Sequence, residues 1–223
     1  MQNYLALVTA AALAAFLLRS WLSASRQAAA FPDLIFSAVK TLFENPEQSL
    51  GTGKGTWILS GTYQGHVFQL KAIIDTLATR KLPSLWLLIS LPEAQPVQAT
   101  LDMMLRPASA TSFSNFDFLP HTLRTPEGFP PEAVLRTDAL QLCPPPKMLL
   151  KHLDLFREAK AKELLISPRG LRIVMHVAEV DRLRYMVLRE ARFDDTVIDA
   201  AFTEQAMKVL LALNAELTHE YRH

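Results

Sequence analysis

The feature that most constrains this chain is an uncharged apolar run close to its N-terminus. No charged residue occurs from Leu5 to Leu18, and the first charge of the chain is Arg19. Because a helix rises about 1.5 Å per residue, the run covers roughly 21 Å, and its extension to Leu22 covers roughly 27 Å. The second length approaches a hydrocarbon core of about 30 Å, provided that the Arg19 side chain reaches the headgroups. The run therefore predicts a helix that spans a membrane once.

The ends of the run fit the same prediction, because Tyr4 and Trp21 stand where interfacial aromatic residues are common. We expect a membrane anchor over residues 1–26. The expected anchor residues are Tyr4, Leu5, Leu18, Arg19, Trp21 and Leu22. Two alternatives stay open. A secretory signal peptide would be cleaved near residues 28–30, although no basic residue precedes the run. A buried or interfacial helix is the other alternative, and an interfacial helix needs a polar face that the run lacks.

The charges around the run predict its orientation. Arg19 and Arg26 follow the run, and no Lys or Arg precedes it. The positive-inside rule then predicts that the N-terminus is outside and the C-terminal domain is cytoplasmic. The single Cys143 agrees with a reducing compartment, because secreted domains usually pair their cysteines. The sequence therefore predicts a single-pass membrane protein that contacts the lipid bilayer through its N-terminal helix.

The rest of the chain has the composition of an ordinary folded domain. The full chain has 223 residues, 50% of them hydrophobic, and a formal net charge of +1. A net charge this small creates no field that would attract nucleic acid, so we expect no nucleic-acid partner. Dinucleotide, hydrolase and kinase fingerprints are absent, so we also expect no cofactor and no catalytic residue.

Residues 31–105 predict a first α+β unit. Alternating residues favour two strands joined by a turn at residues 61–65, and a later segment that is apolar on both faces favours a central strand. The expected elements are a helix from Pro32 to about Glu44 ended by Asn45–Pro46, strands over 57–60, 67–74 and 85–91, and a short helix over 99–105.

Residues 106–146 form a connecting segment rich in Pro and Phe. A long segment with little secondary structure inside a compact chain is often functional or linking. A brief strand is expected over residues 132–138. Exposed aromatic side chains would serve as interface anchors, whereas in the alternative the segment is a strap whose Phe side chains pack on the sheet. The candidate partner-binding residues are Phe113, Phe116, Phe118 and Phe129.

Residues 147–223 predict a second α+β unit. The expected elements are a helix over 147–158, a hairpin of strands over 163–167 and 171–180, a third strand over 184–191, and a final helix preceded by Asp194–Asp195. The order matches that of the first unit, which suggests a duplication. The predicted fold class is therefore α+β: an N-terminal transmembrane helix, then two similar α-β-β-β-α units with antiparallel sheets and helices on one face. A coincidental match is the alternative, and the sequence leaves open whether the units form one sheet or two.

The last five residues, His219 to His223, fit the pattern H-E-x-x-H. On a helix, His219 and His223 lie one turn apart and share a Zn²⁺ in metalloproteases, where the intervening Glu activates water. Helix ends fray, however, and no third ligand follows, so a helix end in solvent is the competing interpretation. His219 and His223 stay metal-ligand candidates.

These observations favour a membrane-anchored, non-catalytic accessory or scaffold protein of a larger membrane assembly, with a membrane protein as its partner. Two other functions stay open. One is a zinc-dependent hydrolase that uses the C-terminal HEYRH, and the other is a small-molecule or lipid sensor with a pocket between the two units.

Overall fold

The computed structural model describes residues 13–19, 22, 30–53, 55–76, 82–107, 111–158, 160–188, 191–193 and 196–221. Residues 13–19 and 30–35 are helical. The other elements, in chain order, are η1 (Val39–Leu42), β1 (Glu44–Leu50), β2 (Thr56–Tyr63), β3 (His66–Asp75), β4 (Ser84–Leu91), β5 (Leu101–Leu105), η2 (Phe116–Phe118), β6 (His121–Leu123), β7 (Ala133–Thr137), η3 (Pro146–Arg157), β8 (Ala161–Ser167), β9 (Gly170–Glu179), α2 (Arg182–Leu188) and α3 (Ala200–Tyr221).

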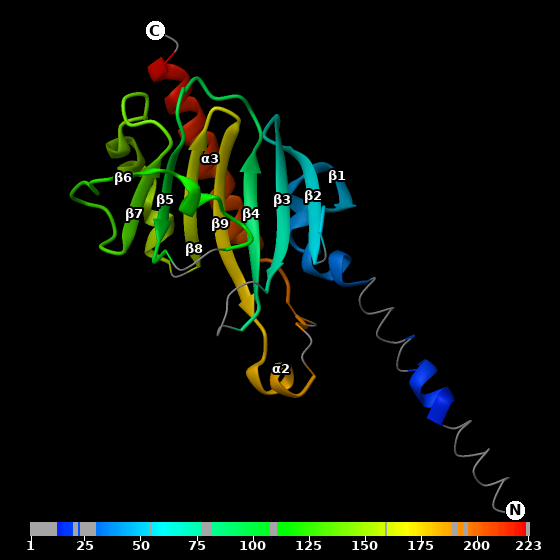
Figure 1. The fold of residues 1–223 in the computed structure, drawn as a ribbon. Coiled ribbons are helices and arrows are strands. Elements are labelled where there is room, and N and C mark those ends of the chain that lie inside the picture. Colours follow the sequence, from blue (N-terminus) through cyan, green and yellow to red (C-terminus); the bar gives the residue numbers. More distant parts are fainter. Residues whose placement is uncertain are drawn as a thin grey trace, which may run out of the picture.

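The strands of the described residues form one sheet of nine strands, in the order β1-β2-β3-β4-β9-β8-β5-β7-β6. Figure 1 shows the sheet from its front with α3 behind it. All of the pairings are antiparallel. In the middle of the sheet β4 pairs with β9, which comes much later in the chain. Both halves of the chain therefore contribute strands to one continuous layer.

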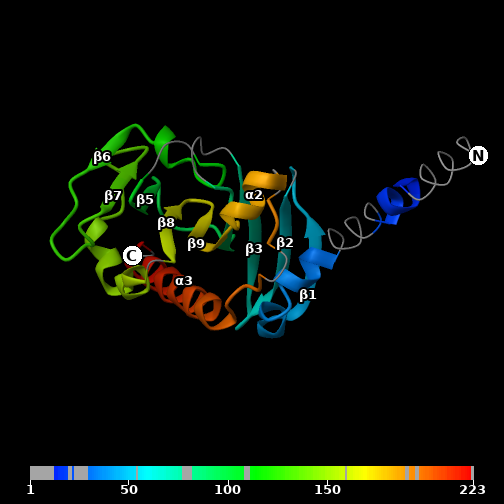
Figure 2. The ribbon, with the colours of Figure 1, turned by 90° about the horizontal axis from the view of Figure 1, so that it is seen from below.

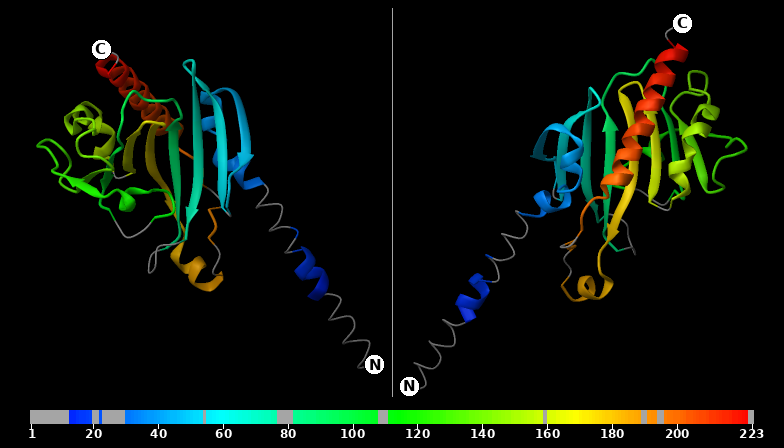
Figure 3. Two further views of the ribbon diagram at one scale, coloured as in Figure 1. Left: turned by 45° about the horizontal axis from the view of Figure 1, so that its top comes forward. Right: turned by 180° about the vertical axis from the view of Figure 1, so that it is seen from behind.

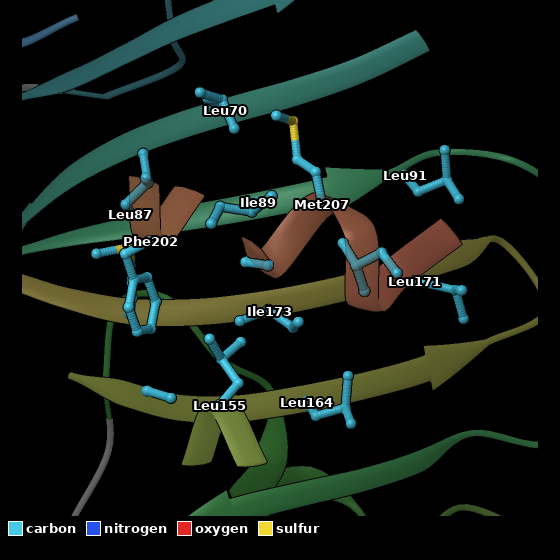
Figure 4. Packing of buried hydrophobic residues seen from close by; sticks show 14 of the residues in the cluster. Leu70, Leu87, Ile89, Leu91, Leu155, Leu164, Leu171, Ile173, Phe202 and Met207 are labelled. Atoms are coloured by element: carbon cyan, nitrogen blue, oxygen red, sulfur yellow. The ribbon is translucent and has the colours of Figure 1, made fainter. Parts of the chain in front are cut away.

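One face of the sheet, called the helix face below, is covered by α3, η1 and η3 (Figures 2 and 3). Its side chains are mostly aliphatic, as alternation along half-buried strands requires. Figure 4 shows Phe202 and Met207 of α3 over Ile89 and Ile173 of the two central strands. Buried residues recur along α3 every three or four positions, which is the spacing of one helical face. They include Phe202, Ala206, Leu210, Leu213 and Leu217.

The opposite face, called the strap face below, is crossed by residues 111–119, which we call the strap (Figure 2). The strap contains η2 and lies on the other side of the sheet from α3. Phe113 and Phe116 of the strap are 4% and 2% exposed. They belong to a second apolar cluster, separate from that of the helix face, whose other buried members are Ile73, Leu88, Met104 and Val174.

The two edges of the sheet are short or irregular. β1 pairs with β2 through a register shift between Glu44 and Glu47, where Asn45 has a φ of 49° and Pro46 follows. Six of the seven β1 side chains are exposed. The other edge strand, β6, has three residues. The regular, fully paired part of the sheet therefore lies between these edges.

The predicted fold of two similar α-β-β-β-α units is wrong. The structure has a single nine-stranded sheet in which β5, from the first predicted unit, is inserted beside β8 of the second. The second half also lacks the predicted third strand at residues 184–191, since α2 occupies Arg182–Leu188. The sensor alternative placed its pocket between two such units, and the structure does not divide into them.

The predicted membrane-spanning helix is also corrected. Among the described residues, no helix is both long and apolar enough to cross a membrane. The predicted anchor residues within the described part are Leu18, Arg19 and Leu22, and those outside it are Tyr4, Leu5 and Trp21. The single-pass membrane localisation, with the N-terminus outside and a cytoplasmic C-terminal domain, is overturned by the same finding.

Two local predictions failed for identifiable reasons. Residues 99–105 were predicted to be helical, but Leu101–Leu105 is strand β5, paired on both sides. Pairing between strands distant in sequence overrides local propensity there. Gly61 was predicted to lie in the turn but lies inside β2. A Cβ at this position would come 2.6 Å from the Cβ of Phe43. The glycine is required by packing.

Candidate functional site: a buried carboxyl pair beside an aromatic strap

The register of β5 and β8 brings two carboxyl groups together on the strap face. Asp102 of β5 pairs with Leu165, and Glu163 of β8 pairs with Met104, so the two acids are diagonal neighbours. Diagonal neighbours on one face of an antiparallel pair are within reach of each other. Asp102 and Glu163 share a side-chain hydrogen bond. Their exposed fractions are 1% and 0%, so the pair is closed to solvent.

An arginine from the neighbouring strand holds one member of this pair. The Arg172 guanidinium of β9 donates a hydrogen bond to Glu163 Oε1 over 2.7 Å, and 21% of its side chain is exposed. Burial raises the pKa of Asp102 well above its usual range, the Glu163 carboxylate raises it further, and Arg172 lowers it. The raised pKa favours the protonated form of Asp102, and Glu163 is the member of the pair that accepts the hydrogen bond from Arg172.

A second arginine connects this acid pair to the strap. Arg136 of β7 is the direct cross-strand partner of Asp102. Its Nη1 donates to the carbonyl oxygens of Phe116 and Asp117, over 3.3 Å and 3.1 Å, and also lies 4.0 Å from Asp117 Oδ1. The guanidinium stands 5.0 Å from the centre of the Phe116 ring, a cation–π distance. Arg136 thus fixes the position of η2 on the sheet.

The network is incompletely hydrogen-bonded. Among the described residues, Asp102 Oδ1, Glu163 Oε2 and the Nε atoms of Arg136 and Arg172 are buried without a hydrogen-bond partner. Buried polar atoms are almost always paired, so each exception calls for an explanation. Here two acceptors and two donors are unpaired on one face of four adjacent strands. These four atoms could therefore take part in further hydrogen bonds.

An aromatic group continues the strap face beyond Phe113. Trp86 of β4 lies between Phe113 and His176, with ring centroids 4.5 Å and 5.0 Å away. Trp86 and His176 are half-buried. Burial lowers the pKa of His176, although Glu179 acts in the opposite direction. The imidazole therefore favours its neutral form, as expected for a ring packed on an indole.

The structure divides the four predicted partner-binding residues. Phe113 and Phe116 are buried under the strap, and Phe129 is half-buried against the core of the helix face. Phe118 is 82% exposed. The packed-strap alternative therefore holds for Phe113 and Phe116, and Phe129 is also turned inward. The exposed-anchor alternative holds for Phe118, which projects into solvent.

The two predicted metal ligands are not brought into a larger cluster by the described residues. His219 is exposed in the last turn of α3, and His223 lies outside the described residues. Within the described part of the chain, no three His, Cys, Asp or Glu side chains gather in a way that could hold a metal ion. The predicted zinc site stays a prediction.

The sequence analysis did not identify the acid pair or its arginines. One signal was available, because Asp102 interrupts an otherwise apolar segment and Glu163 precedes two leucines. A charged residue inside a buried strand is rare unless it is paired. The pairing itself depends on β5 lying next to β8, and the helix predicted at residues 99–105 concealed it.

Comparisons with known proteins leave the site unassigned. No protein-family model matches this chain, and no curated protein matches it. Among solved structures, the chain is similar to the crystal structure of the mycobacterial trehalose monomycolate transport factor A, TtfA, with a TM-score of 0.41 and 11% sequence identity. The similarity covers 81% of this chain and 94% of that chain. It is a loose likeness that assigns no function to this chain.

Proposed function

We propose that this chain is a non-catalytic accessory protein that holds a partner protein against the strap face of its sheet. The observation that carries the proposal is Phe118, which is 82% exposed although Phe113 and Phe116 of the same strap are buried. Full burial of a Phe side chain gains about 1.5–3 kcal/mol relative to exposure. A partner that encloses the Phe118 ring gains this free energy, and aromatic rings are frequent anchors of protein interfaces.

The sheet beside the strap supplies a surface on which the partner can lie. No described helix covers it, and its side chains mix apolar, hydroxyl and cationic groups. The half-exposed side chains there are Ile58, Ser60, Gln69, Lys71, Ser90, Leu165 and Arg172. Arg172 keeps part of its guanidinium side chain exposed on this surface, and the Lys71 ammonium adds a second cation. We therefore infer a partner segment that combines carboxylates with apolar side chains.

The non-catalytic part of the proposal rests on the closure of the acid pair. Two hydrogen-bonded carboxyls beside arginines resemble a general acid–base pair in composition, but a general acid or base must come within hydrogen-bond reach of its substrate. Asp102 and Glu163 are 1% and 0% exposed. A substrate therefore has no access to either carboxyl in this arrangement.

Site-specific photo-crosslinking in the native cell tests the proposal. A benzophenone amino acid is placed at Phe118, and in a matched control at Gln205, which is exposed on α3 on the helix side. We expect a covalent adduct with one protein from position 118 and none from position 205. The added substitution Lys71→Glu is expected to lower the yield at position 118 at least about fivefold, because it reverses a charge that faces the partner. Equal adducts from both positions, or none from position 118, would contradict the proposal.

A further inference from the structure

Arg136 is a neighbour of both the strap and the acid pair. Arg136 lies directly across from Asp102 in the register of β5 and β7. Its Nη1 is committed to the carbonyl oxygens of Phe116 and Asp117 in the strap. Its Nε is buried without a partner, and so is Asp102 Oδ1. A donor and an acceptor on directly opposed residues are thus both unpaired.

The protonation of Asp102 explains why this hydrogen bond is absent. A neutral Asp102 shares its hydrogen bond with Glu163 and attracts the Arg136 guanidinium weakly. An ionised Asp102 would attract it strongly, because a charge-assisted hydrogen bond is roughly twice as strong as a neutral one. Asp102 would also repel the Glu163 carboxylate, so its hydrogen bond with Glu163 would be lost.

We propose that Asp102 operates a proton-controlled latch on the strap. While Asp102 holds its proton, Arg136 holds the strap on the sheet. When Asp102 loses the proton, Arg136 turns to the Asp102 carboxylate, its hydrogen bonds to Phe116 and Asp117 break, and the strap detaches.

The charged groups described around Asp102 fit this assignment. Glu163 on β8 opposes ionisation, and Arg172 on β9 favours it while remaining bound to Glu163. On the strap, the exposed Asp117 carboxylate lies near Arg136 at 4.0 Å and weakly favours the closed state. Lys162 donates to the carbonyl oxygen of Arg106 beyond the end of β5.

The direction of the pH dependence follows from the raised pKa of Asp102. Between the pKa of a free Asp and that of the buried Asp102, the closed state binds a proton that the open state releases. Closure is therefore favoured at low pH and weakens as the pH rises toward the pKa of the buried group. Opening would uncover the apolar surface of Ile73, Leu88 and Val174, on which Phe113 and Phe116 rest.

Hydrogen exchange on the isolated full-length chain tests the latch without any partner. The reporter is the Phe118 amide, which donates to the Asn115 carbonyl over 3.0 Å. This amide is expected to lose its protection against exchange when the strap opens. Amides of α3 report whether the rest of the fold stays closed. We expect the protection factor of the Phe118 amide, corrected for the intrinsic exchange rate, to fall as the pH rises while α3 stays protected.

Asp102→Asn is the decisive variant, because its amide donates to Glu163 as a protonated Asp does but never ionises. We expect it to keep the strap at least about tenfold more protected than the wild type at the highest pH, the factor that corresponds to one pKa unit. Asp154→Asn, an exposed carboxyl on η3, is the matched control and is expected to behave as the wild type.

Glu163→Gln gives a second, independent readout if Asp102→Asn does not fold. Removing the Glu163 charge makes Asp102 easier to ionise, so the strap is expected to open at lower pH than in the wild type. A strap whose protection is independent of pH, an equal fall in Asp102→Asn, or an unchanged opening pH in Glu163→Gln would each overturn the latch. The latch can fail while Phe118 still gives its adduct with a partner, so the two proposals fail separately.

Discussion

The helix face and the strap face of the sheet are closed by different chemistry. On the helix face, α3 covers the central strands with side chains such as Phe202, Met207 and Leu210, and the contacts are mostly aliphatic. On the strap face, a short irregular segment is held by two phenylalanine rings and by hydrogen bonds from Arg136. A carboxyl pair lies buried next to those hydrogen bonds.

The two faces therefore differ in how strongly solution conditions affect their closure. Apolar burial is nearly independent of pH and of ionic strength, so the helix face closes under all conditions in which the protein folds. A buried charge network is weak evidence for stability, and removing one partner of it is strongly unfavourable. We therefore expect closure of the strap face to depend on the pH and the ionic strength of the solution.

The largest effect is expected from truncation of the helix face. Leu210 is fully buried between α3 and the sheet, and Leu210→Ala is expected to lower the free energy of unfolding by about 3 kcal/mol through lost burial and the remaining cavity. Denaturant unfolding measures this. Leu183→Ala on α2, where the side chain is 78% exposed, is the control and should stay within about 0.5 kcal/mol of the wild type. Similar losses in the two variants would show that α3 does not close the core.

A smaller effect is expected from truncation of the strap. Phe116→Ala removes a ring that is 2% exposed, but the strap can detach while the sheet stays folded, so the loss is limited to the free energy of docking the strap. We expect about 1–2 kcal/mol in global unfolding, with a larger loss of protection at the Phe118 amide. Phe118→Ala should leave both quantities near wild type. A loss as large as that of Leu210→Ala would show that the two faces are equally integral to the fold.

The N-terminus of α3 tests whether charge matters on the helix face too. Asp199 Oδ1 accepts the Phe202 amide over 3.1 Å and Oδ2 accepts Lys160 over 2.9 Å. The Lys160 hydrogen bond first, and then the Phe202 amide, lower the pKa of Asp199. Its contribution is present above the pKa of a free Asp and is lost as the pH falls toward the lowered value.

Asp199→Ala is therefore expected to cost about 1 kcal/mol near neutral pH, as loss of a helix cap does, and less in acid. Thermal unfolding at several pH values measures the difference. Asp199→Asn keeps the cap but loses the charge that attracts Lys160, so it should recover only part of the loss near neutral pH. A cost that persists unchanged in acid would show that the carboxylate charge is irrelevant there.

The smallest effect concerns His176 on the strap face. Burial lowers its pKa, so below about pH 6.5 the unfolded chain takes up a proton that the folded chain refuses. Stability should fall in that interval as the pH drops, and His176→Phe should flatten this part of the pH profile. An unchanged profile would show that the ring is not shielded by Trp86 and its neighbours.

Local patterns in the sequence predicted much of the sheet. The hairpin of β8 and β9, the central β4 and the brief strand β7 follow from alternation, an apolar run and turn residues, and the structure contains them. Pairing between distant segments could not be predicted, because period-2 patterns do not encode which strand lies next to which. The short α2 was mistaken for a strand since a seven-residue segment fits both periods.

The candidate site was predictable only in part. Phe113, Phe116 and Phe118 were recognised as a group, but their alternation between buried and exposed depends on where η2 turns over the sheet. Asp102 and Glu163 are far apart in the sequence and meet only through the register of two strands. The sequence shows two acidic residues, but their contact and the raised pKa of Asp102 are properties of the fold.

The irregular edges of the sheet bear on how the protein behaves when it is concentrated. An unpaired strand edge is a template onto which another chain can add, and such addition can propagate into fibres. At β1 the register shift, the missing N–H of Pro46 and the charges of Glu44 and Glu47 interrupt that template, and β6 is too short to offer a long one. Strand addition is therefore disfavoured at both ends of the sheet, and the molecule is protected against edge-to-edge aggregation.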